Sequence, residues 1–340
     1  MFSLFPLIRK YLVGSEASSV NEARLGAEEF GGEMHVFSPS YTEENLRDYI
    51  KYADHLVFNS FSQWNRFKSP IRNSSKHISC GIRVNLEHSE TENPMYDPSS
   101  PNSHFGVPVE NFEPNNLEGI EGLHFHNLCE LNADALQRTL EVFEEKFGKY
   151  LHLMKWVNFG GGHHITRKDY DVELLCRIII DFKQRYPHLE VYLEPGEAIS
   201  LNAGVLVASV VDIFTKGTKA RGNTTNFVVL DVSATTHMPD VLEMPYRPSV
   251  LGANLPDATE NLYRLVGPTC LTGDVIGSYS FPNPLQIGQK LVFMNMAIYT
   301  MVKNHTFNGI NLPSIAVMHK NKSIEVIKRF GYEDFKGRLS

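Results

Sequence analysis

The amino-acid sequence predicts an α/β fold, a TIM (β/α)8-type barrel followed by a C-terminal, mostly antiparallel β domain. Up to about residue 196, short apolar runs alternate with amphipathic segments. Each run is nearly continuous in apolar character, as a strand buried on both faces requires. Beyond this point long β-type runs appear and helical patterns are few. We therefore expect a barrel domain over residues 1–203 and a β-rich domain over residues 204–340.

Six apolar runs predict strands of the parallel sheet, and a weaker pattern at residues 14–19 predicts a seventh. The six runs are residues 34–38, 55–60, 79–85, 122–127, 156–162 and 190–195. Amphipathic helices are expected between them, most clearly over residues 132–147 and 169–186. A complete TIM barrel has eight strands. Because the chain opens on a helix-like segment at residues 2–12, we expect the first barrel strand to be missing from it.

The β-rich domain is predicted from runs that are separated by frequent Pro and Gly. These runs are residues 205–215, 226–232, 289–296 and 314–319. Tyr299, inside the apolar run MAIYTM, is expected in a core strand, and a short helical tail is expected at residues 322–330.

Composition and charge exclude several classes of protein. The chain has 340 residues, with 32 Lys+Arg against 39 Asp+Glu and a net charge of −7, so no basic surplus exists for binding nucleic acid. The apolar stretches are too short to span a bilayer, and the first residues lack the features of a signal peptide. We expect neither a nucleic-acid partner nor a membrane segment.

The cysteines indicate a reducing compartment. They are Cys80, Cys129, Cys176 and Cys270, far apart and without a CxxC pair. This is too few for a disulfide framework and the wrong spacing for structural zinc, so the cytoplasm is the expected location. The first three lie in core-like runs and are interpreted as small buried apolar groups.

Two motifs of the barrel domain carry candidate chemistry. His124 and His126, in GLHFHNLCE, are two residues apart on a strand and therefore face the same side. They could place a ring on a planar cofactor, bind a metal as an HxH pair, or simply pack together. Gly160, Gly161 and Gly162 follow the next strand, where bare backbone N–H groups can surround a phosphate.

Further polar groups follow the last barrel strand and lie in the second domain. Glu194, in EPGE, ends that strand and could bind a protonated ring nitrogen. Cys270, in the Gly-rich segment GPTCLTGD, is a candidate acid or nucleophile. Four charged or titratable groups in LDVSATTHMPDVLEMPYRP suit an acidic pocket for a cationic substrate, or a structured loop with internal salt bridges: Asp231, His237, Asp240 and Glu243.

These motifs occur in the same order in one known family. The sequence resembles the carboxynorspermidine/carboxyspermidine decarboxylases, within the fold-type III pyridoxal-phosphate decarboxylases, over essentially its whole length. The set GLHFHNLCE, NFGGGHHIT, EPGEAI, DVSATTHMPDVLEMPYRP and GPTCLTGDVIGSY carries the resemblance. It implies decarboxylation of carboxynorspermidine or carboxyspermidine to norspermidine or spermidine plus CO2, with pyridoxal 5′-phosphate as cofactor and no metal. It also implies a homodimer with shared active sites.

The resemblance also implies a role for individual residues. His126 would stack on the pyridine ring, and Cys270 of the partner subunit would protonate the substrate carbon. The residues implied in cofactor binding are Gly160, Gly161, Gly162, Glu194, Tyr299 and Arg83. The residues implied in binding the polyamine substrate are Glu197, Asp231, His237, Asp240 and Asp274. Glu197 stands where relatives that act on small amino acids have Arg, which suits a longer cationic substrate.

The sequence departs from the family pattern in two places. The family's cofactor-binding lysine ends the first barrel strand, and FSLFPLIRKYL resembles the segment that follows it, so we expect this lysine upstream of Met1. Lys10 cannot replace it, because it lies on the following helix. His104, in SHFG, stands where a basic residue is expected. Two alternatives are a catalytically inactive relative that binds polyamine or a sister subunit, and a metal-dependent barrel hydrolase that uses His124 and His126.

Overall fold

The chain divides into two compact units, Met1–Ile199 and Ser200–Ser340. The computed structural model describes residues 2–91, 94–217 and 224–340. The division falls within helix α7 (Gly196–Ser200), a few residues before the predicted boundary at residue 203.

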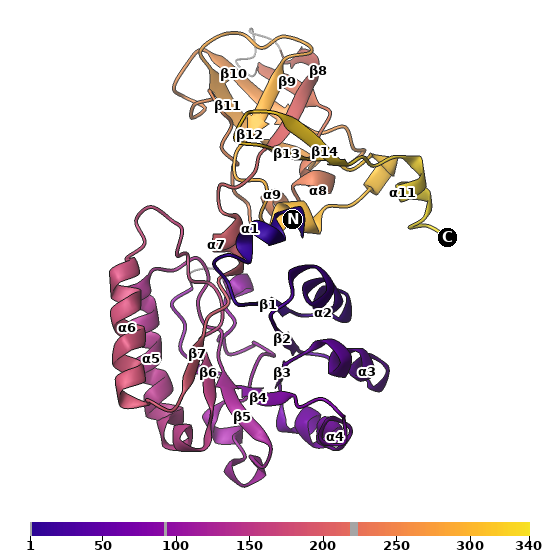
Figure 1. The fold of residues 1–340 in the computed structure, drawn as a ribbon. Helices are drawn as coiled ribbons and strands as arrows, with labels where there is room; N and C mark the ends of the chain where they lie inside the picture. The colour runs from indigo at the N-terminus through magenta and orange to yellow at the C-terminus, as the bar shows by residue number, and fades with distance from the viewer. Residues whose placement is uncertain (1, 92–93, 218–223) are drawn as a thin grey trace. The chain divides into compact units, whose positions relative to one another are not determined.

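The first unit is built on one sheet whose strands lie side by side in chain order, β1 to β7 (Figure 1). These strands are β1 (Gly14–Ala17), β2 (Glu33–Ser38), β3 (His55–Phe58), β4 (Ser79–Arg83), β5 (Ile120–His124), β6 (Trp156–Asn158) and β7 (Glu190–Tyr192). All neighbouring pairs are parallel. The parallel α/β sheet predicted from the apolar runs is therefore confirmed, with seven strands in the described part of the chain.

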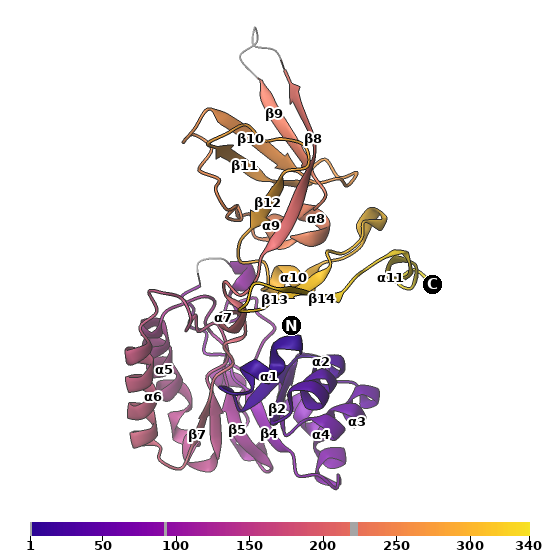
Figure 2. The ribbon, with the colours of Figure 1, turned by 45° about the horizontal axis from the view of Figure 1, so that its top comes forward.

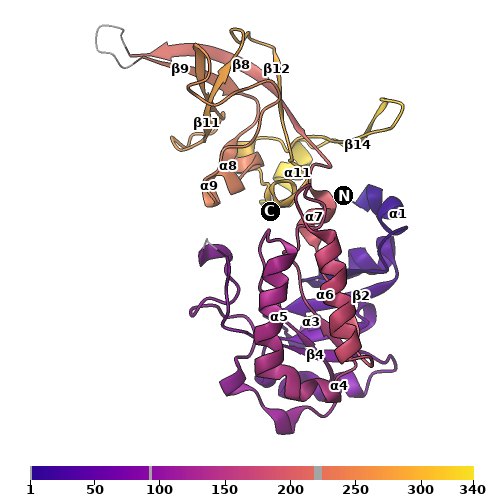
Figure 3. The same ribbon diagram turned by 90° about the vertical axis from the view of Figure 1, so that its left-hand side faces the viewer.

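Helices connect these strands and lie along the sheet. Figure 1 shows α2, α3 and α4 beside the first strands and α5 and α6 beside the last ones, and Figure 3 shows α5 and α6 packed side by side. The helices are α1 (Phe5–Ile8), α2 (Val20–Leu25), α3 (Glu43–Tyr52), α4 (Phe61–Arg72), α5 (Ala133–Phe147), α6 (Val172–Arg185) and α7. A π-helical turn, η2 (Gly26–Phe30), follows α2, and 3-10 turns are η1 (Phe2–Leu4), η3 (Pro94–Tyr96), η4 (Val109–Asn111), η5 (Pro114–Asn116) and η6 (Gly148–Leu153).

Local sequence explains where these helices begin. Four of them start at a side-chain oxygen that accepts a hydrogen bond from the backbone N–H three residues later, which satisfies a donor of the first turn. The capping residues are Ser19, Thr42, Ser60 and Asp171. The apolar stripes of α5 and α6 then face the core that fills the space between helices and sheet.

A smaller cluster lies on the other face of the sheet and is organised by Trp156. The indole N–H of Trp156 donates to Oγ of Ser79 over 2.8 Å. Its ring lies against Gly81 and Gly122, and a Cβ added at Gly122 would lie 2.1 Å from the ring. Strands β4 and β5 therefore require glycine at these two positions, where the Trp156 ring crosses them.

The second unit contains a mixed five-stranded sheet in the order β11-β10-β9-β8-β12 (Figure 2). Only β9 and β10 pair in parallel within it; the other three pairs are antiparallel. The strands are β8 (Leu206–Lys216), β9 (Thr225–Leu230), β10 (Asn261–Val266), β11 (Val275–Phe281) and β12 (Lys290–Phe293). A separate antiparallel pair is formed by β13 (Ile315–Met318) and β14 (Ile324–Lys328). The predicted, mostly antiparallel β domain is confirmed.

Short helices complete the second unit. They are α8 (Ala234–His237), α9 (Asp240–Glu243), α10 (Tyr299–Lys303) and α11 (Tyr332–Lys336), with a 3-10 turn η8 (Phe307–Gly309). The core of this unit lies on the five-stranded sheet and includes Leu230, Leu265 and Phe293, all fully buried.

Three predictions for individual segments are wrong. Residues 322–330 do not form a helix, because they contain strand β14, whose five residues are all exposed. Tyr299 is not in a core strand; it begins α10 and is 54% exposed. Cys176 is exposed on α6 rather than buried.

Two further observations concern cysteines and membranes. All four cysteines carry free thiols, with Cys80 buried and Cys129 partly buried. Within the described part of the chain, every helix is too short or too polar to cross a membrane.

Candidate active site

Most of the predicted cofactor-binding residues lie at the carboxyl ends of neighbouring strands in the first unit. Arg83 is the last residue of β4, and His126 follows β5 by two residues. The glycines 160–162 follow β6, and Glu194 follows β7 by two residues. The carboxyl ends of parallel strands meet at one edge of the sheet, which is where the active sites of barrel enzymes form.

The carboxylate of Glu194 is held by two side chains. Nδ2 of Asn158 donates to Oε1 over 2.7 Å, and Nε2 of His124 lies 3.2 Å from Oε2. Oδ1 of Asn158 in turn accepts the N–H of Gly160 over 2.8 Å. The carboxylate and the glycine turn are therefore joined through one buried amide.

Electrostatics keep this carboxylate ionised. Burial alone would raise the pKa of Glu194, but the neighbouring His124, with its hydrogen bond to the carboxylate, lowers it below the ordinary value. Burial lowers the pKa of the His124 imidazole, against the opposing effect of Glu194. At neutral pH we assign a carboxylate to Glu194 and a neutral ring to His124.

His126 presents a neutral imidazole in a fixed orientation. Its Nδ1 accepts the N–H of Gly161 over 3.1 Å, so the proton of the neutral ring is on Nε2. Burial, together with the charge of Arg83, lowers the pKa of His126 to about 3. A neutral ring held in this way is suited to stack on a flat aromatic group.

The glycine turn after β6 leaves backbone donors for an anion. Gly162 has a φ of +80°, and a Cβ added there would lie 1.9 Å from the carbonyl oxygen of Leu128, so only glycine fits. No residue in the described part of the chain accepts a hydrogen bond from the N–H of Gly162 or His163. Both residues line a small hollow together with Gly196 and Glu197. Unpaired N–H groups in such a turn are typical of phosphate sites.

Arg83 is a buried cation held by aromatic rings. Its guanidinium lies 4.5 Å from the ring centroids of both Phe37 and Phe105, and the residue is 5% exposed. Burial lowers the pKa of Arg83 to about 10, while the carboxylates of Glu194 and Glu16 oppose this effect. The side chain therefore stays charged at neutral pH.

Sequence reasoning missed two residues around this site. Asn158 is a single polar residue between Val157 and Phe159 and gave no signal, and Glu16 on β1 was not singled out. His104 is exposed, with its ring 4.0 Å from that of Phe105.

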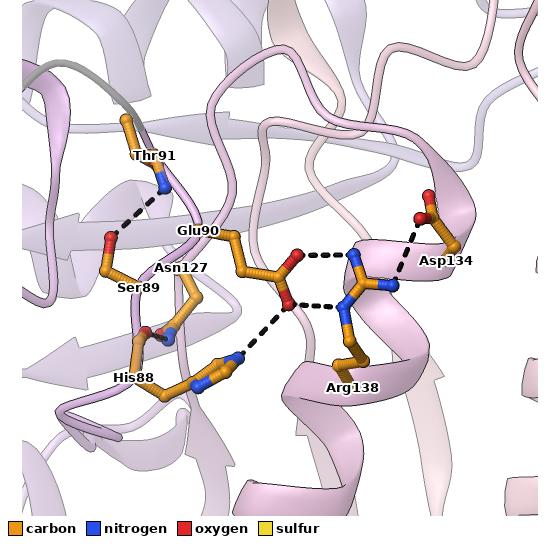
Figure 4. A network of polar contacts seen from close by, with 7 residues as sticks. All are labelled: His88, Ser89, Glu90, Thr91, Asn127, Asp134 and Arg138. Carbon is orange, nitrogen blue, oxygen red and sulfur yellow. Dashed lines mark hydrogen bonds and ion pairs between the residues drawn. The ribbon is translucent and has the colours of Figure 1, made fainter.

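A polar network, shown in Figure 4, anchors the loop that follows β4. Glu90, in the loop after β4, pairs with Arg138 of α5 through both carboxylate oxygens, and Arg138 also reaches Asp134 over 3.1 Å. Nδ2 of Asn127, the residue after His126, donates to the carbonyl of His88 over 2.6 Å. The network thus ties the segment that carries His126 to the loop after β4.

In the second unit, Asp274 is enclosed by its own chain. It is 2% exposed, and its carboxylate accepts hydrogen bonds from the hydroxyl of Ser233 and from both the N–H and the hydroxyl of Thr269. Thr269 precedes Cys270, whose own N–H donates to Oδ1 of Asn308 over 2.9 Å. In this structure Asp274 therefore supports the loop that carries Cys270, and its predicted contact with substrate stays a prediction.

The other predicted substrate residues differ in accessibility. His237 is 3% exposed and lies between the N–H of Ser233 and the carbonyl of Asn311. Asp240 is 8% exposed and pairs with Lys303 over 2.6 Å. Asp231, in contrast, is exposed.

The described residues do not support the metal-hydrolase alternative. In the described part of the chain, the only group of three potential metal ligands is Glu33, His35 and His55, which does not include His124 or His126. The rings of His35 and His55 are stacked 3.9 Å apart and nearly parallel, at 8°. Their lone pairs therefore lie in parallel planes and do not converge on one point.

Comparison with known proteins gives the family. Residues 19–297 match the model of the pyridoxal-dependent decarboxylase family, described as its C-terminal sheet domain. The chain belongs to this family, whose cofactor is pyridoxal phosphate. The resemblance derived from the sequence motifs is thus confirmed, and nothing in the comparisons supports a catalytically inactive relative.

Three relatives are similar over nearly the whole chain. A carboxyaminopropylagmatine decarboxylase of Synechocystis is 43% identical over 100% of this chain and 86% of its own length. A carboxynorspermidine/carboxyspermidine decarboxylase of Campylobacter jejuni is 42% identical over 97% of this chain and 86% of its own length. The crystal structure of carboxynorspermidine decarboxylase complexed with norspermidine, from Campylobacter jejuni, matches with a TM-score of 0.90 and 41% identity over 99% of this chain and 89% of that one.

Proposed function

We propose that this protein removes the carboxylate of carboxynorspermidine or carboxyspermidine as CO2 and releases norspermidine or spermidine. The observation that carries the proposal is the similarity to decarboxylases of these compounds over nearly the full chain, at 42% identity and a TM-score of 0.90.

The groups at the strand ends fit pyridoxal phosphate. Glu194 supplies an ionised carboxylate for the ring N–H, His126 a neutral ring for the ring face, and the turn at Gly162 unpaired N–H groups for the phosphate. Arg83 adds a buried positive charge, and the resemblance adds Tyr299 as a phosphate contact. When bound, pyridoxal phosphate withdraws electrons from the bond to the departing carboxylate.

Two residues of this chain would take part in the reaction. Glu194 would hold a proton on the ring nitrogen of the bound cofactor through a charge-assisted hydrogen bond. Cys270 would deliver a proton to the carbon that loses CO2. Because the resemblance implies sites that are shared between subunits, we propose a homodimer in which Cys270 serves the partner's site.

Acidic groups would bind the ammonium groups of the substrate. Asp231 is exposed and Glu197 is partly exposed, so both can be reached by a substrate. His237, Asp240 and Asp274 are enclosed, and we propose that they shape the loops around the bound chain. The free thiols support the cytoplasm as location.

A second candidate substrate is carboxyaminopropylagmatine. The relative named for it is 43% identical to this chain, as similar as the carboxynorspermidine/carboxyspermidine enzyme. Agmatine ends in a planar guanidinium, whereas norspermidine and spermidine end in primary amines. A carboxylate binds guanidinium through two parallel hydrogen bonds and a primary ammonium as a point charge, so one site discriminates between them.

The test is a competition assay with the purified protein loaded with pyridoxal phosphate. Equal amounts of carboxynorspermidine, carboxyspermidine, carboxyaminopropylagmatine and diaminopimelate are supplied, and the amine products are followed by mass spectrometry. Norspermidine and spermidine are expected to form fastest. Faster release of aminopropylagmatine would favour the second candidate, and turnover of diaminopimelate alone would contradict both.

A further inference from the structure

We propose that His124 is a positioning residue, whose Nε2–H holds Glu194 ionised and correctly oriented to accept the ring N–H of pyridoxal phosphate. The inference rests on one part of the proposed function, the binding of the cofactor by Glu194. The juxtaposition of His124 and Glu194 itself is independent of any substrate.

The geometry places one donor on each oxygen of the carboxylate. His124 ends β5, Asn158 ends β6, and the two residues are directly paired in the sheet. Asn158 donates to Oε1 over 2.7 Å, and the Nε2 of His124 lies 3.2 Å from Oε2. A carboxylate bonded at both oxygens cannot turn about its last torsion without losing one of these bonds. Its remaining lone pairs therefore stay in a fixed plane.

The surroundings of His124 fix its tautomer. The residue is 1% exposed, and its Nδ1 has no hydrogen-bond partner in the described part of the chain. Because an ionised carboxylate only accepts, the single ring proton must be on Nε2. The other charged or titratable groups that face it are Arg83 and His35, and the Phe37 ring lies 5.6 Å away. None of these offers Nδ1 a proton or an acceptor.

The two donors to Glu194 differ in what they contribute. Asn158 is also bonded to the glycine turn, so its loss would disturb the phosphate region as well. Among the side chains that the structure describes, His124 is bonded only to Glu194. Removing its Nε2–H therefore takes away the donor to one oxygen of a partly buried carboxylate, and this favours the protonated carboxylic acid. A protonated Glu194 can no longer accept the ring N–H.

The first test reads His124 directly in the protein without cofactor, by nitrogen NMR of histidine-labelled chains. We expect His124 to show an unprotonated Nδ1 and a protonated Nε2 throughout the neutral range, with the Nε2 signal shifted in Glu194→Gln. A proton on Nδ1, or no response to Glu194→Gln, would overturn the proposal. Neither reading depends on substrate or turnover, so it stands apart from a failure of the proposed function.

The second test measures the affinity for pyridoxal phosphate in matched variants. In His124→Gln the side-chain amide nitrogen replaces Nε2, whereas His124→Leu removes the donor at similar volume. We expect His124→Leu to bind about tenfold or more weakly and His124→Gln to stay within about threefold of the natural protein, as for a hydrogen bond to a charged group. In a Glu194→Gln background, His124→Leu is expected to have little further effect. Equal weakening by both substitutions, or a full effect of His124→Leu in that background, would show a merely structural role. Should His124→Leu fail to fold, the NMR result on the unchanged histidine decides.

Discussion

Asn158 and Glu194 form a partly buried amide–carboxylate pair, with Nδ2 of Asn158 2.7 Å from Oε1 of Glu194. Asn158 is 0% exposed, and its Oδ1 accepts the N–H of Gly160 over 2.8 Å. One side chain therefore fixes both the proposed acceptor of the ring N–H and the start of the proposed phosphate turn.

Substitution of Asn158 by Asp should destabilise the protein and weaken cofactor binding. A second carboxylate would replace a donor at 2.7 Å from Glu194, so one of the two must take up a proton. We expect a loss of about 2 kcal/mol or more in the free energy of unfolding, measured by urea titration, and at least tenfold weaker binding of pyridoxal phosphate. Asn65→Asp, on the exposed face of α4, is the control and should leave both quantities nearly unchanged. Equal effects of the two substitutions would contradict the assigned pair.

Gly162→Ala should be strongly destabilising. Its Cβ would lie 1.9 Å from the carbonyl oxygen of Leu128, at a φ of +80° that other residues rarely adopt. We expect a loss of about 2–3 kcal/mol in the free energy of unfolding. Gly148→Ala is the matched control, because it has helical φ and ψ and its Cβ would make only ordinary contacts. In thermal denaturation, Gly162→Ala should have a lower Tm than the natural protein, and Gly148→Ala should not.

Substitution of Asp274 should lower the stability of the protein, whereas substitution of Asp231 should weaken substrate binding. Asp274→Asn removes a buried carboxylate that accepts from Ser233 and Thr269, so a loss of about 2 kcal/mol in the free energy of unfolding is expected. Asp231→Asn changes an exposed group and should leave that free energy within about 0.5 kcal/mol. Asp231→Asn should instead raise KM for the triamine substrate, because the substrate's ammonium groups lose one carboxylate partner. A raised KM in Asp274→Asn with unchanged unfolding would reverse the assignment of the two residues.

The buried His163 should make the free energy of unfolding decrease at acidic pH. Burial lowers its pKa to about 4, and the residue is 1% exposed. The unfolded chain takes up the proton below its ordinary pKa of about 6.5, whereas the folded chain resists it down to about 4. Stability therefore falls as the pH drops through this window, by roughly 2 kcal/mol for this group between pH 6.5 and pH 5.

The check for His163 is a comparison of unfolding titrations at pH 7 and pH 5. The difference in the free energy of unfolding between the natural protein and His163→Asn should shrink by roughly 2 kcal/mol at the lower pH. The exposed His152, changed to Asn, serves as reference. If the difference stays constant with pH, folding does not shift the protonation of His163 between pH 7 and pH 5, and the prediction is wrong.

The parallel sheet could be predicted because each of its strands is a short apolar run with a clear boundary. Strand β4, for example, is buried at all five positions, so burial on both faces leaves a continuous pattern. Strand β10 was missed, although its buried Tyr263 and Leu265 alternate with exposed residues. Strand β14 was mistaken for a helix because it has no buried face, and Ile324 and Ile327 have the spacing of a helical turn.

The site could be predicted only where a motif marks it. Glu194, His126 and the glycines stand in recognisable motifs at strand ends, whereas the residues that support them do not. Asn158 continues an apolar run, and the bond between His124 and Glu194 joins residues 70 positions apart. Such pairings depend on which strands become neighbours, and spacing along the chain does not carry that information.

The parallel pairing of β9 and β10 has a consequence for the segment that connects them. Parallel neighbours cannot be joined by a tight turn, so the chain must leave the sheet after Leu230 and return at Asn261. This excursion carries Asp231, His237 and Asp240, while both of its ends are pinned by adjacent strands. The two strands thus fix where this segment begins and ends, while its contacts with Asp274 and Lys303 fix its path between them.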